Sequence, residues 1–365
     1  MKKMKAAVLY EANTPLRVEE VTVDDPKDQE VLVKMVATGV CHSDLGIIKG
    51  ENPSPFPIVL GHEGAGIVQK VGPGVTLVQP GDHVVLPGIF TCGKCRYCVE
   101  GQPALCSEVL PALVTGTLPG GERRLHKGDQ ELNIFYTSAF AEYVVVHERT
   151  AVKVRDDAPL DVVCLLSCAV STGVGSVVNR ARIRAGESIV IYGCGGTGLS
   201  AVMGAKLAGA GKLIAVDVFD HKLQKAKELG ADYVINASHD NVQQRVSEIT
   251  GGGADYAIET TGNLDVTVQA FASIHDAGTC VLVGAAPFGS MLTTPPYQFL
   301  LGKKLTGSLM GNIRTRIDVP RYVDLYMDGK LPIDKLISRY YSLDEINEAF
   351  AALERGEVIR SVIRF

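Results

Sequence analysis

The stretch Ser188-Ile-Val-Ile-Tyr-Gly-Cys-Gly-Gly-Thr-Gly198 decides the fold of the C-terminal half of this chain. An apolar strand runs directly into a G-x-G-x-x-G loop, and an apolar segment with helical character follows from Leu199. Glycines in such a loop allow a tight turn and let the backbone approach a pyrophosphate, which then lies at a helix N-terminus. The stretch therefore predicts a dinucleotide-binding site formed by Gly193, Gly195, Gly196, Thr197 and Gly198.

An acidic residue at the end of the next predicted strand extends this site. Asp217 follows Gly198 by nineteen residues, at the position where a carboxylate can accept hydrogen bonds from ribose hydroxyls. A 2′-phosphate would meet a like charge there, so the sequence favours NAD over NADP. The alternative is a glycine-rich turn and an ordinary strand-terminal aspartate, but the strand before the loop and the helix after it favour the dinucleotide site.

The pattern around this motif differs between the two halves of the chain. Short β-branched runs separated by turn residues predict an irregular β-rich domain up to about residue 160, with strands at 18–23, 30–36, 81–86 and 143–146. Apolar strands then alternate with helices, which predicts a doubly wound parallel sheet of the α/β class. Its strands are expected at 187–192, 212–216, 233–236, 254–259 and 278–284, with helices from Leu199, His221, Asn241 and Leu264. A helix near 343–354 and a strand at 359–365 would return to the first domain.

Length and composition are those of an ordinary globular protein. A chain of 365 residues exceeds the size at which single cores stop growing, so two domains are expected. The hydrophobic fraction of 46% excludes a disordered chain, and the net charge of −5 gives no reason to expect nucleic acid or an anionic membrane as partner. No apolar run approaches the ~18 residues of a membrane helix. The chain start has no signal-peptide core, so we expect a cytoplasmic protein.

Four of the nine cysteines are closely spaced, at Cys92, Cys95, Cys98 and Cys106. Four thiolates at such spacing are typical of structural zinc. Disulfides or a redox-active Cys-x-x-Cys pair are the alternatives, but the odd cysteine count and a reducing compartment favour the metal. The sequence thus predicts one closed zinc site.

Three further candidate ligands lie far apart in the sequence: Cys41 in Cys-His-Ser-Asp44, His62 in Gly61-His-Glu-Gly-Ala-Gly66, and Cys168. Each of these residues alone is weak evidence for a metal site. A lone cysteine is most often a small buried apolar residue, and a lone histidine is more often a core residue with its hydrogen bonds satisfied than a metal ligand. Spacing alone cannot join them.

The combination of these motifs resembles the zinc-dependent alcohol dehydrogenases of the medium-chain dehydrogenase/reductase superfamily, in their long, liver-like or benzyl-alcohol form. The resemblance runs from the first strand to Ile359-Arg-Ser-Val-Ile-Arg-Phe365. It implies a GroES-like catalytic domain at 1–169, a Rossmann NAD-binding domain at 170–309, and a return of 310–365 to the catalytic domain. It also implies two zinc ions per chain and a homodimer or homotetramer.

The roles that the resemblance implies can be assigned position by position. Cys41, His62 and Cys168 match the ligands of a catalytic zinc that keeps one open position, while Cys92, Cys95, Cys98 and Cys106 match the structural zinc ligands. Asp44 matches a carboxylate that orients the histidine ligand, Glu63 an acidic residue near the metal, and Ser43 the hydroxyl that passes on the alcohol proton. Helix capping near Leu45 is the alternative for Ser43 and Asp44. The remaining matches are cofactor contacts at His42, Thr172, Lys222 and Arg360.

The implied reaction is NAD-linked oxidation of primary alcohols to aldehydes, and the reverse, through a zinc-bound alkoxide and hydride transfer. Two positions depart from the pattern: Gly46 replaces a relay histidine, and Gly88 stands where an aromatic residue lines the substrate pocket of liver enzymes. With Ala285, and an apolar wall of Ile134, Phe135 and Leu309, this predicts a roomy pocket for larger or aromatic alcohols.

Two alternatives remain. An S-(hydroxymethyl)glutathione dehydrogenase is disfavoured because residues 51–55 lack two expected acidic residues and no arginine stands just after Cys106. A zinc-stabilised nucleotide-binding module without catalysis would leave His62 and Cys168 unexplained.

Overall fold

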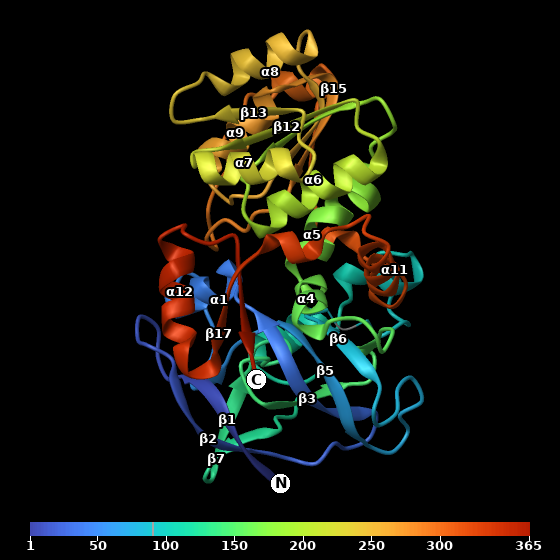
Figure 1. Ribbon diagram of the computed structural model, residues 1–365, viewed down its shortest axis with the longest axis vertical. Coiled ribbons are helices and arrows are strands. Elements are labelled where there is room, and N and C mark those ends of the chain that lie inside the picture. The colour runs from blue at the N-terminus through green and yellow to red at the C-terminus, as the bar shows by residue number, and fades with distance from the viewer. Residues whose placement is uncertain (90) are drawn as a thin grey trace. The chain divides into compact units, whose positions relative to one another are not determined.

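The computed structural model describes residues 1–89 and 91–365. The chain forms two compact units (Figure 1). Unit 1 comprises Met1–Cys168, Arg314–Gly329 and Ile333–Phe365, and unit 2 comprises Ala169–Ile313 and Lys330–Pro332.

Unit 2 is built on a six-stranded parallel sheet in the order β13-β12-β11-β14-β15-β16. Parallel neighbours need crossover connections, and helices α6 to α9 supply them (Figure 1). The strands are β11 (Ser188–Tyr192), β12 (Lys212–Asp217), β13 (Tyr233–Asn236), β14 (Ala254–Glu259), β15 (Ile274–Leu282) and β16 (Lys304–Gly307). The crossover helices are α6 (Gly196–Ala208), α7 (Asp220–Glu228), α8 (Val242–Thr250) and α9 (Leu264–Ala272).

The predicted doubly wound sheet is confirmed, and the differences lie at element ends. Helix α6 begins at Gly196, three residues before the expected Leu199, because the last part of the glycine loop already has helical geometry. Strand β15 begins at Ile274 instead of 278. Asn241 and Asn263 accept backbone hydrogen bonds from the first turns of α8 and α9, as N-cap residues do.

Unit 1 contains a closed barrel of five strands in the order β1-β2-β7-β8-β4. Its core consists of alternate apolar residues such as Val8, Val21 and Leu132, each with no more than 2% exposed. The barrel strands are β1 (Lys2–Leu9), β2 (Arg17–Val23), β4 (Ile58–Val59), β7 (Leu125–Lys127) and β8 (Gln130–Ile134).

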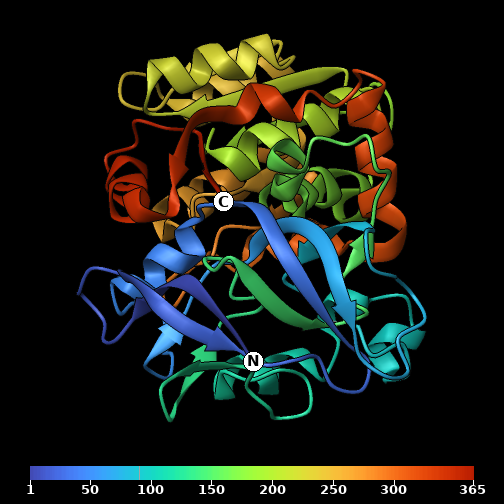
Figure 2. The same cartoon turned by 60° about the horizontal axis from the view of Figure 1, so that its bottom comes forward.

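A second sheet of unit 1 has seven strands, which come from both the N-terminal and the C-terminal parts of the chain. Strand β18 pairs antiparallel with β3, and the amide of Phe365 donates to the carbonyl of Val36 at 3.1 Å, so the C-terminus lies beside β3 (Figure 2). The expected return of the tail to the first domain is therefore present in the sheet. Its strands are β3 (Glu30–Gly39), β5 (Glu63–Val71), β6 (His83–Pro87), β9 (Tyr143–His147), β10 (Val152–Lys153), β17 (Ile337–Ser342) and β18 (Arg360–Arg364).

The other helices are short, apart from one in the tail. In unit 1 they are α1 (His42–Ile48), α2 (Arg96–Val99), α3 (Val109–Thr115), α4 (Leu160–Val163), α11 (Thr315–Met327) and α12 (Ile346–Glu354), and in unit 2 they are α5 (Ala169–Gly175) and α10 (Tyr297–Leu300). Short 3₁₀ turns are η1 (Pro103–Leu105), η2 (Cys164–Ser167), η4 (Met310–Asn312), η5 (Ile333–Leu336) and η6 (Leu343–Glu345), and η3 (Ser176–Ala181) is a short π-helix. Among the described residues, no single helix is long and apolar enough to cross a membrane. The bent pair of helical segments 160–167 and 169–181 has, taken together, the length and composition of a membrane span.

Candidate active site

Unit 1 brings Cys41, His62 and Cys168 together from three separate segments. Cys41 immediately precedes α1, His62 immediately precedes β5, and Cys168 immediately follows the turn η2. One potential ligand atom from each of them, together with a carboxylate oxygen of Glu63, lies within 4.8 Å of the others. Two thiols and one imidazole are a donor set that suits a zinc ion whose fourth position is open to water or substrate.

Asp44 fixes the orientation of the His62 ring. The Nδ1 atom of His62 lies 3.1 Å from Oδ2 of Asp44, and the Gly61 amide donates to Oδ1 of the same carboxylate at 3.0 Å. Although burial lowers the pKa of His62, the negative charges of Asp44 and Cys41 raise it well above its ordinary value. Because Nδ1 faces Asp44, Nε2 is left for a metal ion.

Asp44 and Ser43 lie inside helix α1, not before it. The helix begins at His42, with Cys41 as its N-cap and without a side-chain capping hydrogen bond. The alternative of capping near Leu45 is therefore wrong, because the helix starts three residues earlier. The hydroxyl oxygen of Ser43 lies 3.8 Å from the Cys41 sulfur and accepts its hydrogen bond, which puts Ser43 beside the ligand cluster.

Glu63 and Arg360 form a fully buried ion pair next to the three ligands. An Nη2 atom of Arg360, from β18, hydrogen-bonds Oε2 of Glu63, while Oε1 of Glu63 has no partner among the described residues. Burial raises the pKa of Glu63 to about 7, against the opposing effect of Arg360. The pairing of β18 with β3 thus brings the end of the chain to the candidate metal site.

The thiols of Cys41 and Cys168 share a hydrogen bond, which separates their ionisation. It lowers the pKa of Cys41 well below its ordinary value and raises the pKa of Cys168 well above it. Two buried thiols that compete for one proton in this way can bind a cation, which would stabilise both of them as thiolates.

Two aromatic rings contact the His62 imidazole. The centroid of Phe135 lies 5.5 Å from that of His62, edge-on, and the centroid of Tyr136 lies 5.6 Å away. Phe135 was expected to line the pocket, whereas the sequence analysis missed Tyr136, which no local motif marks. A Cβ atom on Gly88 would lie 3.2 Å from the Tyr136 ring. The ring of Tyr136 therefore packs against Gly88, one of the two positions from which a roomy pocket is predicted.

Gly46 is also closely packed. A Cβ atom there would lie 2.6 Å from the side-chain nitrogen of Asn52. The side chain of Asn52, which no motif in the sequence marks, therefore covers Gly46, where the resemblance leads one to expect a relay histidine.

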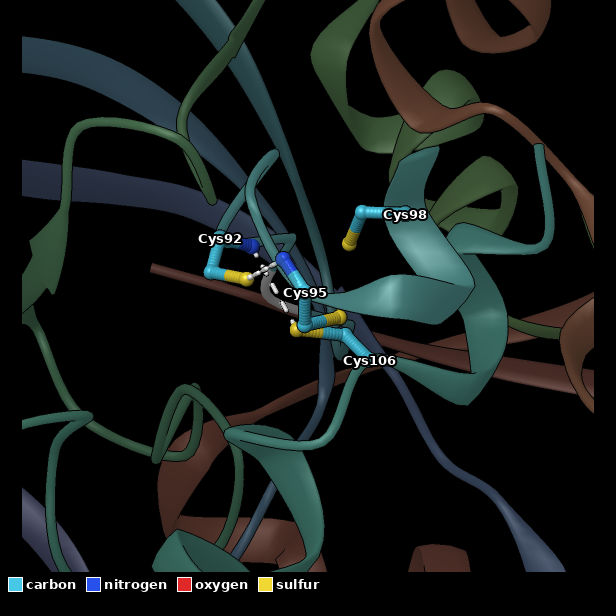
Figure 3. A group of neighbouring side chains, drawn as sticks. All are labelled: Cys92, Cys95, Cys98 and Cys106. Atoms are coloured by element: carbon cyan, nitrogen blue, oxygen red, sulfur yellow. Dashed lines mark hydrogen bonds between the residues drawn. The ribbon is translucent and has the colours of Figure 1, made fainter. Parts of the chain in front are cut away.

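The four other cysteines form a second cluster, shown in Figure 3, with Cys98 on helix α2. Their sulfur atoms lie within 4.8 Å of one another. The amide of Cys95 donates to the sulfur of Cys92 at 3.2 Å, and that of Cys92 donates to the sulfur of Cys106 at 3.3 Å. Hydrogen bonds from the amides of Ser107 and Cys98 lower the pKa of Cys95 to about 6. Four convergent thiols with this support fit a closed zinc site.

The glycine loop of unit 2 has the geometry that a pyrophosphate requires. Gly193 has a φ of +90°, in the region that favours glycine, and its amide donates to the carbonyl of Val216 at 2.8 Å. A Cβ atom on Gly198 would lie 1.7 Å from the Gly193 carbonyl oxygen, so only glycine allows the loop to lie this close to α6. Gly195 is the N-cap of α6, and Gly196 and Thr197 form its first turn, so free amides are directed at the loop.

Asp217 ends β12 beside this loop. Its carboxylate accepts hydrogen bonds from the amides of Cys194 at 2.6 Å, Val218 at 2.8 Å and Phe219 at 3.0 Å. Lys222, on α7, lies over the ring of Phe219 at 4.6 Å. Asp217 and Lys222 therefore both lie near the end of β12.

Two other predicted cofactor contacts, His42 and Thr172, lie on helices α1 and α5. His42 is exposed at the start of α1 in unit 1. Thr172 is buried in α5 of unit 2, where its hydroxyl donates to the sulfur of Met310 at 3.6 Å.

The fold and these sites define a class of protein: a dinucleotide-dependent dehydrogenase with two metal-binding clusters. The family described as "Alcohol dehydrogenase GroES-like domain" matches residues 27–156, and the family described as "Zinc-binding dehydrogenase" matches residues 196–327. The chain belongs to the zinc-dependent alcohol dehydrogenases of the medium-chain superfamily, which are oxidoreductases that use zinc and NAD.

Individual relatives match the chain over its whole length. An S-(hydroxymethyl)glutathione dehydrogenase from Paracoccus denitrificans is 40% identical, with 100% of both chains covered. An alcohol dehydrogenase class-3 from Drosophila melanogaster is 40% identical, covering 99% of this chain and 97% of the relative. The crystal structure of benzyl alcohol dehydrogenase from Acinetobacter calcoaceticus is similar with a TM-score of 0.96, at 37% identity and with 100% of both chains covered.

Proposed function

We propose that this enzyme oxidises primary alcohols, aromatic ones included, to aldehydes with NAD, and catalyses the reverse reduction. The observation that carries the proposal is the cluster of Cys41, His62 and Cys168, with Asp44 on the far side of the imidazole and the rings of Phe135 and Tyr136 against it. A polar metal site with an aromatic wall suits a hydroxyl group attached to a flat apolar group.

We assign the catalytic zinc to Cys41, His62 and Cys168 and the structural zinc to Cys92, Cys95, Cys98 and Cys106. The catalytic ion, when bound, lowers the pKa of a coordinated hydroxyl and polarises a carbonyl. The chain's own residues do the rest. Asp44 holds Nδ1 of His62, Arg360 holds Glu63 beside the ligands, and the hydroxyl of Ser43, next to Cys41, would receive the alcohol proton.

For the cofactor, Gly193 to Gly198 would bind the pyrophosphate and Asp217 the adenosine ribose, with Lys222 beside it. His42, Thr172 and Arg360 are proposed as further cofactor contacts. The catalytic domain would then comprise 1–169 with 310–365, and the NAD domain 170–309.

Two features support the assembly of this chain into a homodimer or a homotetramer. Strand β16 pairs only with β15 among the described strands, so its outer edge can accept another strand. Apolar side chains gather in the adjoining segment, where Phe288, Met291 and Leu300 are exposed by 80% or more. None of the nine cysteines forms a disulfide, which supports a reducing, cytoplasmic location.

S-(hydroxymethyl)glutathione is a second candidate substrate, because relatives of that name are 40% identical over the whole chain. An initial-rate screen over short aliphatic, long aliphatic and aromatic primary alcohols, hydroxy acids and S-hydroxymethylglutathione, with NAD and NADP in parallel, separates the candidates. We expect the highest kcat/KM with a free primary alcohol and NAD. A preference for the glutathione adduct over all free alcohols would reverse the ranking.

A further inference from the structure

The ring of Tyr136 lies against both His62 of the candidate metal site and Gly88. Its ring centroid is 5.6 Å from that of His62, and its Cγ and Cδ1 atoms would lie 3.2 Å from a Cβ atom on Gly88. The ring therefore occupies the space that an aromatic side chain at position 88 would need.

The backbone of Tyr136 explains how the ring reaches this place. In an extended strand consecutive side chains point to opposite faces, yet the rings of Phe135 and Tyr136 are 4.6 Å apart and both contact His62. The φ of Tyr136 is +55°, in the left-handed region, where a bulky residue is rare. This turn rotates the tyrosine to the side of the metal site. A strained bulky residue kept beside a functional site is the pattern expected of a functional constraint.

A cleft in unit 1 lies against the same ring. Its interior volume is about 30 Å³, which is room for about two water molecules, and it is open to solvent. Tyr136 and Gly88 line it together with apolar residues of α3 and its neighbours, among them Val109, Ala112, Leu113 and Leu118. Tyr136 is thus the residue that contacts both His62 and this cleft.

Resting on the proposed function, we propose that Tyr136 is the specificity-determining residue of this enzyme, whose ring limits the substrate beside His62 and separates it from the cleft under α3. The ring offers a flat surface to an aromatic alcohol and blocks long or branched ones. Burial and the charges of Cys168 and Cys41 raise the pKa of Tyr136, which agrees with a neutral phenol packed beside the ligands. Without the ring, the metal site opens into the cleft.

The test is a set of variants assayed against benzyl alcohol, straight primary alcohols of increasing length and branched primary alcohols. Tyr136→Gly suits the left-handed backbone and removes the ring, so we expect kcat/KM for the bulky alcohols to rise about tenfold or more relative to benzyl alcohol. Tyr136→Phe retains the ring and should keep the wild-type ranking of substrates. Gly88→Ala, which presses on the ring, should move the ranking toward smaller alcohols. Val114→Ala, on an exposed part of α3 outside the cleft lining, is the matched control.

The outcomes separate this inference from the function on which it rests. A wild-type enzyme that oxidises no alcohol overturns both. Alcohol oxidation with the same ranking in Tyr136→Gly, or with the same change in Tyr136→Phe as in Tyr136→Gly, overturns the role of Tyr136 alone. If Tyr136→Gly does not fold, the Gly88→Ala ranking decides, and an unchanged ranking there contradicts the inference.

Discussion

The His62 imidazole is held on one side by Asp44, with Nδ1 3.1 Å from Oδ2, while its ring faces Phe135 and Tyr136. Replacing Asp44 with Asn keeps the size of the side chain and an oxygen for the Gly61 amide but removes the negative charge opposite His62. We expect activity or zinc affinity to fall by about 10- to 100-fold. Steady-state rates and zinc content would measure this, with the exposed Glu51→Gln as the matched control. A wild-type rate in Asp44→Asn would refute the orienting role.

Removing a proposed ligand of the catalytic zinc should separate chemistry from cofactor binding. Cys41→Ala or His62→Ala should abolish alcohol oxidation because the donor set is broken, while NAD binding, which depends on the loop of unit 2, stays measurable. Calorimetry with NAD and a rate assay test the two parts. Loss of NAD binding together with activity would mean that the cluster has a structural role instead.

The second cluster should affect folding. Cys95→Ala should lower soluble yield and melting temperature and reduce the zinc content from two ions to one, because structural zinc contributes folding free energy directly. Cys280→Ala, which removes a buried thiol outside both clusters, should keep both ions. A Cys95→Ala protein that folds normally with one zinc would contradict the assignment.

Asp217→Gly should raise the use of NADP relative to NAD, because the charge that opposes a 2′-phosphate is removed. The change also removes the acceptor of three amide hydrogen bonds, so some loss of stability is expected as well. Asp217→Asn keeps an acceptor oxygen and is the control for that loss. The ratio of kcat/KM for the two cofactors is the readout, and an unchanged ratio in both variants would exclude Asp217 from cofactor selection.

His275 should give unit 2 a pH-dependent contribution to stability. The hydrogen bond to Asp255, at 3.1 Å, raises the pKa of His275 above its ordinary value of 6.5 in spite of partial burial. A raised folded-state pKa stabilises the protein below the unfolded pKa, and this is lost as pH rises through the folded pKa. His275→Gln should therefore lower the melting temperature more near pH 6 than near pH 9. The pair is over a third exposed, so the effect should be at most ~1 kcal/mol. An equal loss at both pH values would show that His275 acts through packing alone.

The local sequence was sufficient to predict those parts of the structure that are formed by residues close together in the chain. Strand β11 and the glycine loop are contiguous in the chain. The tight turn of the loop requires residues without a side chain, and the glycines that meet this requirement can be read directly from the sequence. The four clustered cysteines are likewise close in the chain, so their spacing alone predicted that their thiols would converge. The ends of elements were less well predicted, as at Gly196 and at His42, because helix starts depend on caps and loop geometry.

No local pattern joins Cys41, His62 and Cys168: the family resemblance predicted them as one set, and the tertiary structure brings them together, since sheet pairing and the turn η2 join segments with no local relation. It also decided the substrate side of the site. Gly88 and Ala285 predict a roomy pocket, and the structure adds the ring of Tyr136, which a left-handed turn in another segment places against Gly88. The free space at a site is determined by every segment that packs there, whereas a sequence motif describes only one of these segments.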